Sequence, residues 1–367
     1  YANSGSYSVY FYNYNDPEDI LMAVTPGVTD FATSRLVFWA RSNDAARSHQ
    51  MEVVVLSDLN APAQHGVVQT VEVERDYKRF MVRFDPGTNA SYVGIKHGMD
   101  DNYEQLWIDD VAWEPIPETP EIILSDTTHT FTNTLAGLQD SMVVRIENAG
   151  LNPLVVSSVS VSEPFRCDYN GTLNLGESAD VVIYFEPSVS GAFSANVTFN
   201  IEGEFLGNNE IELSGVAYAP YDAISEDFEN GGSQPENWVF YKNDPNNTSA
   251  YVQIDNSSTY ANSGTYSVEL YNAASTTADR DLILISPAVS GLDSGQVNFW
   301  VRHRESALST LPIQVGLWDY ETQKFLPGTS IAVSNEYAFA KFAPSAHFDV
   351  DTLGSKIGLA FRHPYSN

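Results

Sequence analysis

Hydrophobic and polar residues alternate along much of this chain with the two-residue period of a β-strand. In residues 6–12, Tyr7, Val9 and Phe11 share one face, which we predict to be a core face. Clusters of Asn, Asp, Gly and Pro separate similar runs, and no stretch keeps a helical period. The further strands that this pattern predicts are Arg35–Arg41, Glu52–Leu56, Val67–Val73, Arg79–Phe84, Ser91–Lys96 and Leu106–Trp113.

The first strand belongs to a block that occurs twice. Residues 1–13 read YANSGSYSVYFYN, and residues 260–272 read YANSGTYSVELYN, with only three differences. The predicted core face recurs as Tyr266, Val268 and Leu270. Later matches are Phe38-Trp39 with Phe299-Trp300, Asp58 with Asp319, Tyr77 with Tyr337, and His97 with His363. Two copies of one domain therefore flank a different segment.

The two copies cover different parts of that domain. Residues 221–259 precede the block in the second copy and have no counterpart before Tyr1. The stretch that follows His97 in the first copy has no counterpart after His363. We therefore expect both copies to be cut, and the natural chain to be longer.

The segment between the copies begins in the Pro-rich acidic linker EPIPETPE and ends at AYAP. Its alternating runs and short turns are typical of an Ig-like β-sandwich. The predicted strands are Ile122–Leu124, Ser141–Glu147, Leu154–Ser160, Ala179–Phe185, Ala192–Ile201 and Asn209–Val216. The predicted fold class is all-β, with two truncated jelly-roll β-sandwiches (residues 1–117 and 221–367) flanking an Ig-like β-sandwich (118–220) in series.

Charge excludes some partners. The chain has 18 Lys and Arg residues against 48 Asp and Glu, for a formal net charge of −30. Such a field repels phosphate backbones, so we predict no nucleic-acid partner. No apolar run has the length needed to cross a bilayer, so we predict no membrane insertion. Cys167 is the single cysteine, which rules out an intrachain disulfide, and we predict a buried, inert thiol.

Several motifs together resemble known extracellular modules. SEDFENG, YANSGTYS and LWIDDV resemble the MAM-like jelly rolls called cleaved-adhesin or choice-of-anchor J domains, which are common in secreted proteins of Bacteroidota. VRIENAG, VVIYFEP and IELSGVA resemble Ig-like domains of the ASPM/SPD-2/hydin type, also called choice-of-anchor D. The resemblance implies a non-catalytic segment of a large multidomain protein of the bacterial cell surface, adhesin-like or used in gliding, of the kind exported by type IX secretion.

Two alternatives stay open: accessory carbohydrate- or surface-binding modules of a secreted hydrolase or peptidase, and a structural filament or stalk. The partners expected are neighbouring domains of the same longer chain, and surface glycans or secretion and cell-surface machinery. Catalytic signatures such as HExxH and GxSxG are absent, so we predict no enzyme and no catalytic residue.

The resembling jelly rolls imply a structural Ca²⁺ near the ends of the domain. Its ligands would come from the DFE segment (Asp227, Glu229), the SG turn (Ser263, beside Asn262) and the terminal DD (Asp109, Asp110). In the first copy the turn is Asn3-Ser4. On a regular strand Asp109 and Asp110 would face opposite ways. The alternative is that these carboxylates are merely solvated, as we predict for the loop of Asp100, Asp101 and Glu104.

Aromatic residues supply a second candidate site. Tyr10, Tyr12 and Tyr14 share the face opposite the predicted core face, where they could stack on sugar rings; the alternative is that the second sheet or a neighbouring domain covers them. Trp39 and Trp300 are predicted to pack in the core or on the flank of a sheet. His97 and His363 are predicted to make structural hydrogen bonds at strand ends.

Sugar attachment is a third prediction. The tripeptides that begin at Asp126, Asp140 and Asp351 fit the O-glycosylation pattern of Bacteroidota, in which Asp precedes Ser or Thr. The acceptors would be Thr127, Ser141 and Thr352.

Overall fold

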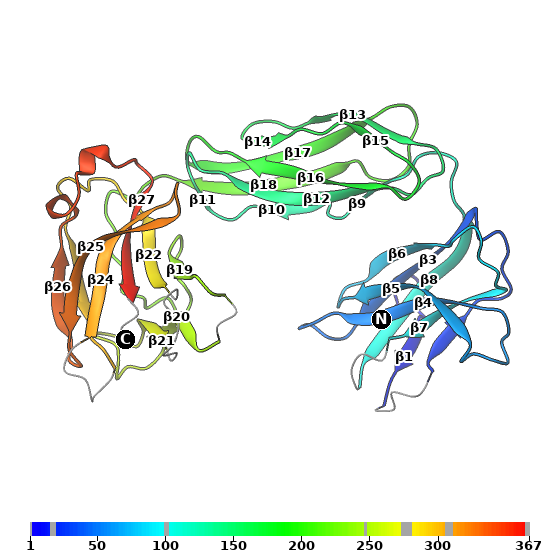
Figure 1. Ribbon diagram of the computed structural model, residues 1–367, viewed down its shortest axis with the longest axis horizontal. Coiled ribbons are helices and arrows are strands. Elements are labelled where there is room, and N and C mark those ends of the chain that lie inside the picture. The colour runs from blue at the N-terminus through cyan, green and yellow to red at the C-terminus, as the bar shows by residue number, and fades with distance from the viewer. Residues whose placement is uncertain are drawn as a thin grey trace.

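The computed structural model describes residues 2–14, 20–98, 103–245, 248–272, 281–304 and 311–363. Within these ranges the chain is all-β apart from two short 3₁₀ turns, Pro344–Ala346 and Val350–Thr352. It forms several β-sandwiches with an Ig-like one in the middle, which confirms the predicted fold class. Figure 1 shows the Ig-like domain in green, with one flanking sandwich at each of its ends.

The N-terminal sandwich packs two four-stranded antiparallel sheets against each other. One has the order β1-β8-β3-β6 and the other β2-β7-β4-β5. Leu36, Phe38, Met51, Leu106 and Ile108 fill the space between them and are at most 1% exposed. The strands are β1 (Val9–Tyr12), β2 (Met22–Val24), β3 (Ser34–Ser42), β4 (His49–Leu56), β5 (His65–Val73), β6 (Lys78–Arg83), β7 (Tyr92–His97) and β8 (Gln105–Pro115).

The first strand differs from its prediction. It begins at Val9, and of the three predicted core residues only Phe11 is buried, while Val9 is 48% and Tyr7 89% exposed. The reason is that β1 is an edge strand whose start no described segment covers. In the C-terminal copy the equivalent Tyr266 is half-buried, because residues of the 221–238 segment such as Gly232 lie against its ring.

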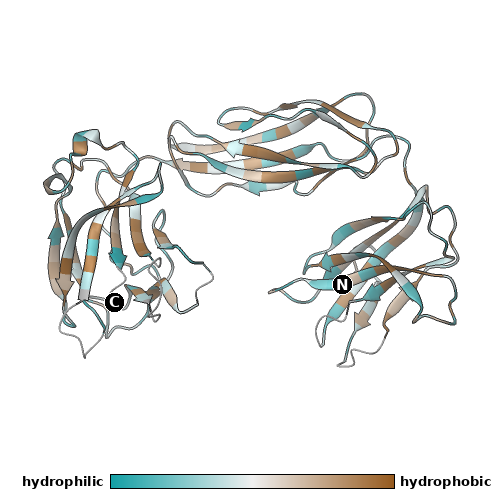
Figure 2. Cartoon of the chain, viewed as in Figure 1, coloured by the Kyte–Doolittle hydropathy of each residue, from teal (hydrophilic) through white to brown (hydrophobic). Residues whose placement is uncertain are grey.

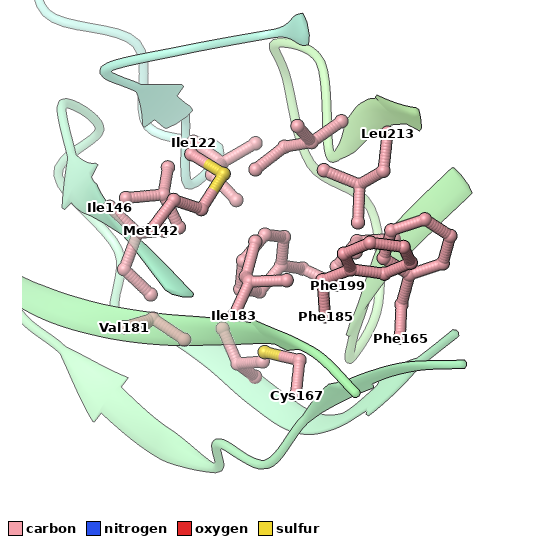
Figure 3. Packing of buried hydrophobic residues seen from close by; sticks show 14 of the residues in the cluster. Ile122, Met142, Ile146, Phe165, Cys167, Val181, Ile183, Phe185, Phe199 and Leu213 are labelled. Atoms are coloured by element: carbon pink, nitrogen blue, oxygen red, sulfur yellow. The ribbon is translucent and has the colours of Figure 1, made fainter. Parts of the chain in front are cut away.

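The Ig-like domain also consists of two sheets, with the orders β10-β18-β17-β13-β15 and β14-β16-β12-β9, and β11 pairs with β18. Figure 3 shows the core between them, where the rings of Phe165 and Phe185 stack with centroids 5.0 Å apart. The strands are β9 (Ile122–Leu124), β10 (Thr128–Thr130), β11 (Thr134–Leu135), β12 (Asp140–Asn148), β13 (Leu154–Ser160), β14 (Phe165–Cys167), β15 (Gly171–Leu173), β16 (Ser178–Phe185), β17 (Gly191–Ile201) and β18 (Glu210–Tyr218).

The C-terminal sandwich repeats the strand order of the N-terminal one. Its larger sheet has the order β19-β22-β27-β24-β25, in which β22-β27-β24-β25 corresponds to β2-β7-β4-β5. Facing it are two pairs, β20-β21 and β23-β26. The strands are β19 (Val239–Lys242), β20 (Ala250–Asp255), β21 (Ser267–Asn272), β22 (Leu282–Ala288), β23 (Val297–Val301), β24 (Leu311–Asp319), β25 (Lys324–Val333), β26 (Ala338–Phe342) and β27 (Ile357–His363).

Brown and teal segments alternate along the strands of all three sandwiches (Figure 2), which is the pattern that the sequence predicts for half-buried sheets. Each sandwich has its own cluster of buried apolar residues. The three sandwiches therefore have separate hydrophobic cores.

A buried ion pair joins the N-terminal sandwich to the Ig-like domain. Arg35 Nη1 lies 2.5 Å from Glu121 Oε2, and its Nη2 lies 2.7 Å from Glu114 Oε1. Arg35 is only 5% exposed. Burial alone would lower the pKa of Arg35, but the hydrogen bonds to Glu121 and Glu114 raise it above its usual value. Arg83, 3.0 Å from Glu147 of the Ig-like domain, adds a second bridge.

Aromatic side chains form the junction between the Ig-like domain and the C-terminal sandwich. Tyr218, at the end of β18, lies beside Tyr221 with ring centroids 6.1 Å apart, and its hydroxyl hydrogen-bonds with Tyr320 of the C-terminal sandwich. Burial raises the pKa of Tyr218 to about 12. The side-chain amide of Asn133 donates to Glu236 across the same junction, at 2.9 Å.

Candidate functional site

An aromatic ladder runs along the outer face of β1. Tyr10 and Tyr12 have nearly parallel rings, with centroids 6.2 Å apart and an angle of 9°. Tyr14 meets Tyr12 edge-on at 6.2 Å and Tyr103 at 5.6 Å. The three predicted tyrosines are 48%, 37% and 75% exposed in chain order, so within the described residues they are open to solvent. The alternation of β1 produces this arrangement, because Phe11 turns inward between Tyr10 and Tyr12.

The ladder continues across the sheet through residues that the sequence did not assign to this site. Trp107 of β8 lies directly opposite Tyr10, with ring centroids 5.1 Å apart. The guanidinium of Arg41 lies over Trp107 at 5.6 Å and over Tyr77 at 5.8 Å. Partial burial, and to a smaller extent Tyr12, raises the pKa of Tyr10. The alternation in LWIDDV could have revealed Trp107, since Leu106 and Ile108 are the core residues on either side of it.

Beside the ladder, two adjacent carboxylates in the middle of β8 hold the Asn3-Ser4 turn. Asp109 Oδ2 accepts hydrogen bonds from the backbone N–H of Asn3 (2.7 Å) and of Ser4 (3.2 Å). Asp110 accepts from the Asn3 side-chain amide (2.9 Å) and from the Ser4 hydroxyl (2.6 Å). The hydrogen bonds from Ser4 and Asn3 lower the pKa of Asp110, so it remains a carboxylate.

The regular-strand geometry that we assumed for Asp109 and Asp110 is wrong. The pairing of β8 with β3 shifts register in this region, and Asp110 has a φ of 49°. A β-bulge of this kind re-aims one side chain, so both carboxylates point at the same turn.

The second copy holds its turn with a carboxylate from the other end of the domain. Glu229 Oε1 accepts from the backbone N–H of Thr265 (2.8 Å) and of Tyr266 (2.7 Å). The carboxylate lies so close to Gly264 that a Cβ there would be 2.4 Å from Glu229 Cδ. In both copies the glycine of the block has a positive φ, 63° at Gly5 and 70° at Gly264, which favours glycine. Asp227 does not reach the turn; it accepts from the N–H of Glu229 at 3.1 Å. Ser263 is exposed in the turn.

The predicted calcium ligands therefore divide between the copies. Asp109 and Asp110 meet the turn in one copy, and Glu229 meets it in the other. Among the described residues no group of three or more Asp, Glu, His or Cys side chains could hold a metal ion. A Ca²⁺ site needs six to eight oxygen ligands, and in the described residues the predicted carboxylates are split between the two copies.

The prediction for the Glu104 loop is wrong where the structure describes it. Glu104 is 3% exposed and lies between two buried histidines: His49 Nδ1 is 2.6 Å and His97 Nε2 is 3.6 Å from its carboxylate. The Glu104 backbone N–H donates to Asn13 at 2.6 Å. Asp100 and Asp101 lie outside the described residues. The sequence did not reveal this cluster, because its members come from three separate segments.

Other predicted residues have mixed outcomes. Trp300 is 52% exposed and packs on the flank of its sheet against Phe339 of the paired strand, with ring centroids 5.2 Å apart, whereas Trp39 is half-buried. Cys167 is 9% exposed, and burial raises its pKa to about 11, which matches an inert thiol. The acceptors Thr127, Ser141 and Thr352 are all exposed.

The fold defines a chain of β-sandwiches with an Ig-like domain in the middle. Residues 120–215 match the family model described as the HYDIN/CFA65/VesB-like Ig-like domain, which agrees with the hydin-type resemblance of this segment. No described helix is long and apolar enough to span a bilayer. A comparison with curated protein sequences gives no match.

Comparison with solved structures finds proteins that are only weakly similar to this chain. The ASH/PapD-like domain 7 of human CEP192 is 19% identical, covering 29% of this chain and 91% of that one, with a TM-score of 0.23. A Porphyromonas gingivalis W83 protein of unknown function is 13% identical, covering 56% and 94%, with a TM-score of 0.23. The secreted serine protease VesC of Vibrio cholerae is 10% identical, covering 87% and 70%, with a TM-score of 0.22. Scores this low identify no activity.

Proposed function

We propose that this chain is a non-catalytic segment of a large extracellular multidomain surface protein of the adhesin type. The N-terminal and C-terminal sandwiches would act as binding modules, and the Ig-like domain as the spacer between them. The resemblance of the flanking copies to MAM-like jelly rolls supports export to the cell surface, by type IX secretion in that family.

The observation that carries this proposal is the buried Arg35–Glu121 pair. An exposed ion pair would contribute little, but a buried one fixes orientation, because separating the partners leaves a charge without compensation. A spacer of this kind holds binding modules at a set distance from the surface that carries them.

Distance measurement tests the spacer. Exposed Ala63 and Asn335, changed to Cys, carry one dye each, while Cys167 stays unlabelled because burial keeps it a neutral thiol. We expect a single narrow distribution of transfer efficiencies between the flanking sandwiches. Arg35→Met should broaden it. Arg166→Met, which removes an exposed pair with Glu186, should not. A wild-type distribution as broad as that of Arg35→Met would contradict a stiff array.

A second candidate function is carbohydrate binding by the N-terminal sandwich, as in an accessory module of a secreted hydrolase or peptidase. The aromatic ladder favours it, because exposed aromatic rings with hydroxyl groups suit the apolar faces and polar rims of sugars. The acidic surface favours neutral over anionic glycans.

A glycan array of the whole chain tests this candidate. We expect binding to neutral glycans that Tyr10→Ala with Tyr12→Ala weakens by at least about tenfold, a loss equal to roughly 1.4 kcal/mol. The matched control is Tyr271→Ala, which removes the tyrosine that occupies the place of Tyr12 in the C-terminal copy. Equal binding by all three proteins, or no binding at all, would exclude the ladder as the site.

We also propose that a sandwich containing both predicted sets of carboxylates, Asp227 with Glu229 and Asp109 with Asp110, binds Ca²⁺. A chimera in which residues 221–259 precede residues 1–117 brings Asp227 and Glu229 to the turn that Asp109 and Asp110 already hold. We expect Ca²⁺ to raise its Tm and EDTA to reverse the rise, since a bound ion stabilises the folded state. The same Tm in both conditions would remove calcium from the proposal.

A further inference from the structure

A buried group of ionisable side chains lies in the N-terminal sandwich where β4 begins and β7 ends. His49 alternates with Met51 along β4, and His97 alternates with Ile95 along β7, so both imidazoles face the core side of their sheet. The carboxylate of Glu104, which directly precedes β8, lies between the two rings. His49, His97 and Glu104 are at most 3% exposed. We call these three residues the His–Glu cluster.

Both ring nitrogens of His49 face carboxylates. Its Nδ1 lies 2.6 Å from Glu104 Oε1, and its Nε2 lies 3.3 Å from Oδ2 of Asp44, in the segment between β3 and β4. The Nε2 of His97 lies 3.6 Å from Glu104 Oε2, and the exposed Arg47 lies 3.3 Å from Asp44 Oδ2. A carboxylate only accepts hydrogen bonds, so His49 can donate to both of its neighbours only when its ring carries two protons.

The backbone beside the His–Glu cluster holds the end of the aromatic ladder. The N–H of Glu104 donates to Asn13 Oδ1 at 2.6 Å, and the N–H of Tyr103 donates to the Asn13 carbonyl at 3.0 Å. Glu104 faces the histidines, whereas Tyr103 is 54% exposed and meets Tyr14 edge-on at 5.6 Å. Tyr103 also has a φ of 64°, which is unfavourable for a residue other than glycine, so its contacts must hold it there. The position of Glu104 therefore affects the outermost rings of the ladder.

We propose that the His–Glu cluster is a pH-sensitive clamp, which orders the Tyr14–Tyr103 end of the ladder as the pH falls from about 8 to about 6, the range in which histidine changes its charge. In the closed clamp a protonated His49 lies between two carboxylates, and in the open clamp water replaces them. Closing therefore takes up a proton, and acid favours it. At higher pH the buried Glu104 carboxylate loses the opposite charge that compensates its burial, so residues 103–105 open more often. Only the effect of the clamp on sugar binding rests on the carbohydrate-binding candidate.

Hydrogen exchange of the whole chain, expressed as protection factors, tests the clamp without any ligand. We expect the amides of residues 12–14 and 103–105 to be at least about fivefold better protected at pH 6 than at pH 8. A closed state that holds one extra proton gains up to about tenfold in population per pH unit. The amides of β16 in the Ig-like domain are the internal control and should have the same protection factors at both pH values.

Three variants identify the titrating group. His49→Gln keeps a hydrogen-bond donor but cannot become charged, so it should remove most of the pH dependence. Asp44→Asn removes one of the two carboxylates at a side chain that is 27% exposed, so it should reduce the pH dependence and carries the same test if His49→Gln does not fold. The matched control is His65→Gln in the same sandwich, where Nδ1 lies 3.0 Å from the Pro62 carbonyl oxygen, and it should keep the full pH dependence.

Equal protection at the two pH values, better protection at pH 8, or a pH dependence that both His49→Gln and Asp44→Asn retain would overturn the clamp. The glycan array, repeated at both pH values, gives a separate readout. Binding to neutral glycans should be tighter at pH 6, and Asp44→Asn should reduce the difference. Equal glycan binding at both pH values would overturn the effect of the clamp on the ladder. Expected protection without any glycan binding would remove the carbohydrate-binding candidate and leave the clamp.

Discussion

The two flanking sandwiches share a sequence block and the strand order of one sheet, yet strands at equivalent places in the other sheet differ in burial. Phe38 of β3, which is paired with β8, is completely buried, whereas Phe299, at the same place in β23, is only half-buried. Within the described residues β3 pairs with both β8 and β6, whereas β23 pairs with β26 alone, and the burial of the two phenylalanines follows that difference. Alternation within the strand itself decides only which face turns inward.

The largest expected effect is the difference in unfolding free energy between two single substitutions, Phe38→Ala and Phe299→Ala. Phe38→Ala should cost about 3–5 kcal/mol of unfolding free energy, because it leaves a cavity in a closed core. Phe299→Ala should cost less, since part of its ring surface is already in water. Denaturant unfolding followed by hydrogen exchange on β3 and β23 separates the two sandwiches. Equal losses would contradict the comparison.

Glu104→Gln tests a buried group for which the C-terminal copy has no described equivalent. We expect a loss of about 2–3 kcal/mol confined to the N-terminal sandwich, because His49 and His97 would lose the carboxylate that lies between them. The exposed Glu336→Gln is the control in the other copy. If exchange rates in β4 and β7 stay unchanged, the cluster has no structural role.

Alkaline pH should affect the two junctions differently. The folded-state pKa of Tyr218 is raised to about 12, so its contribution is complete below pH 10 and is lost as the pH rises from 10 through 12. We expect about 1 kcal/mol of docking energy to disappear, after a discount for partial exposure of the phenol. The guanidinium of Arg35 stays charged over this range. Transfer efficiencies measured from pH 8 to 11.5 should therefore broaden, and Tyr218→Phe should remove the pH dependence.

The smallest effects concern the turns. Asp110→Ala should lower the Tm of the N-terminal sandwich by about 2 °C, and Glu229→Ala that of the C-terminal one by about the same amount, since each removes hydrogen bonds at a solvated site. The exposed Asp76→Ala should have no effect. A Tm change in the sandwich that does not carry the substitution would show that the turns are not independent.

Long alternating runs allowed most strands to be predicted from the sequence. Ile122–Leu124 and Leu154–Ser160 have the observed bounds, and the strand predicted at Leu106–Trp113 is β8. The short strands β11 and β14 were not predicted. Their position depends on the parallel or antiparallel neighbour to which they are hydrogen-bonded.

The candidate site was predictable only in part. The tyrosine ladder follows from alternation within one strand, so the sequence located it. Asp109 and Asp110 both point at the Asn3-Ser4 turn because of a β-bulge, and the exposure of Tyr7 depends on which segments cover an edge strand. Neither is encoded in local periodicity.

The buried arginine at the first junction has a consequence for ionic strength. With 48 acidic and 18 basic residues, the three sandwiches repel one another through water, and dissolved salt shortens the range of that repulsion to about 8 Å at 0.15 M. Arg35 and Glu121 attract each other out of reach of those ions. Added salt should therefore weaken the repulsion between the sandwiches and leave the Arg35–Glu121 ion pair intact. The arrangement of the three sandwiches should accordingly be most stable at high salt concentration.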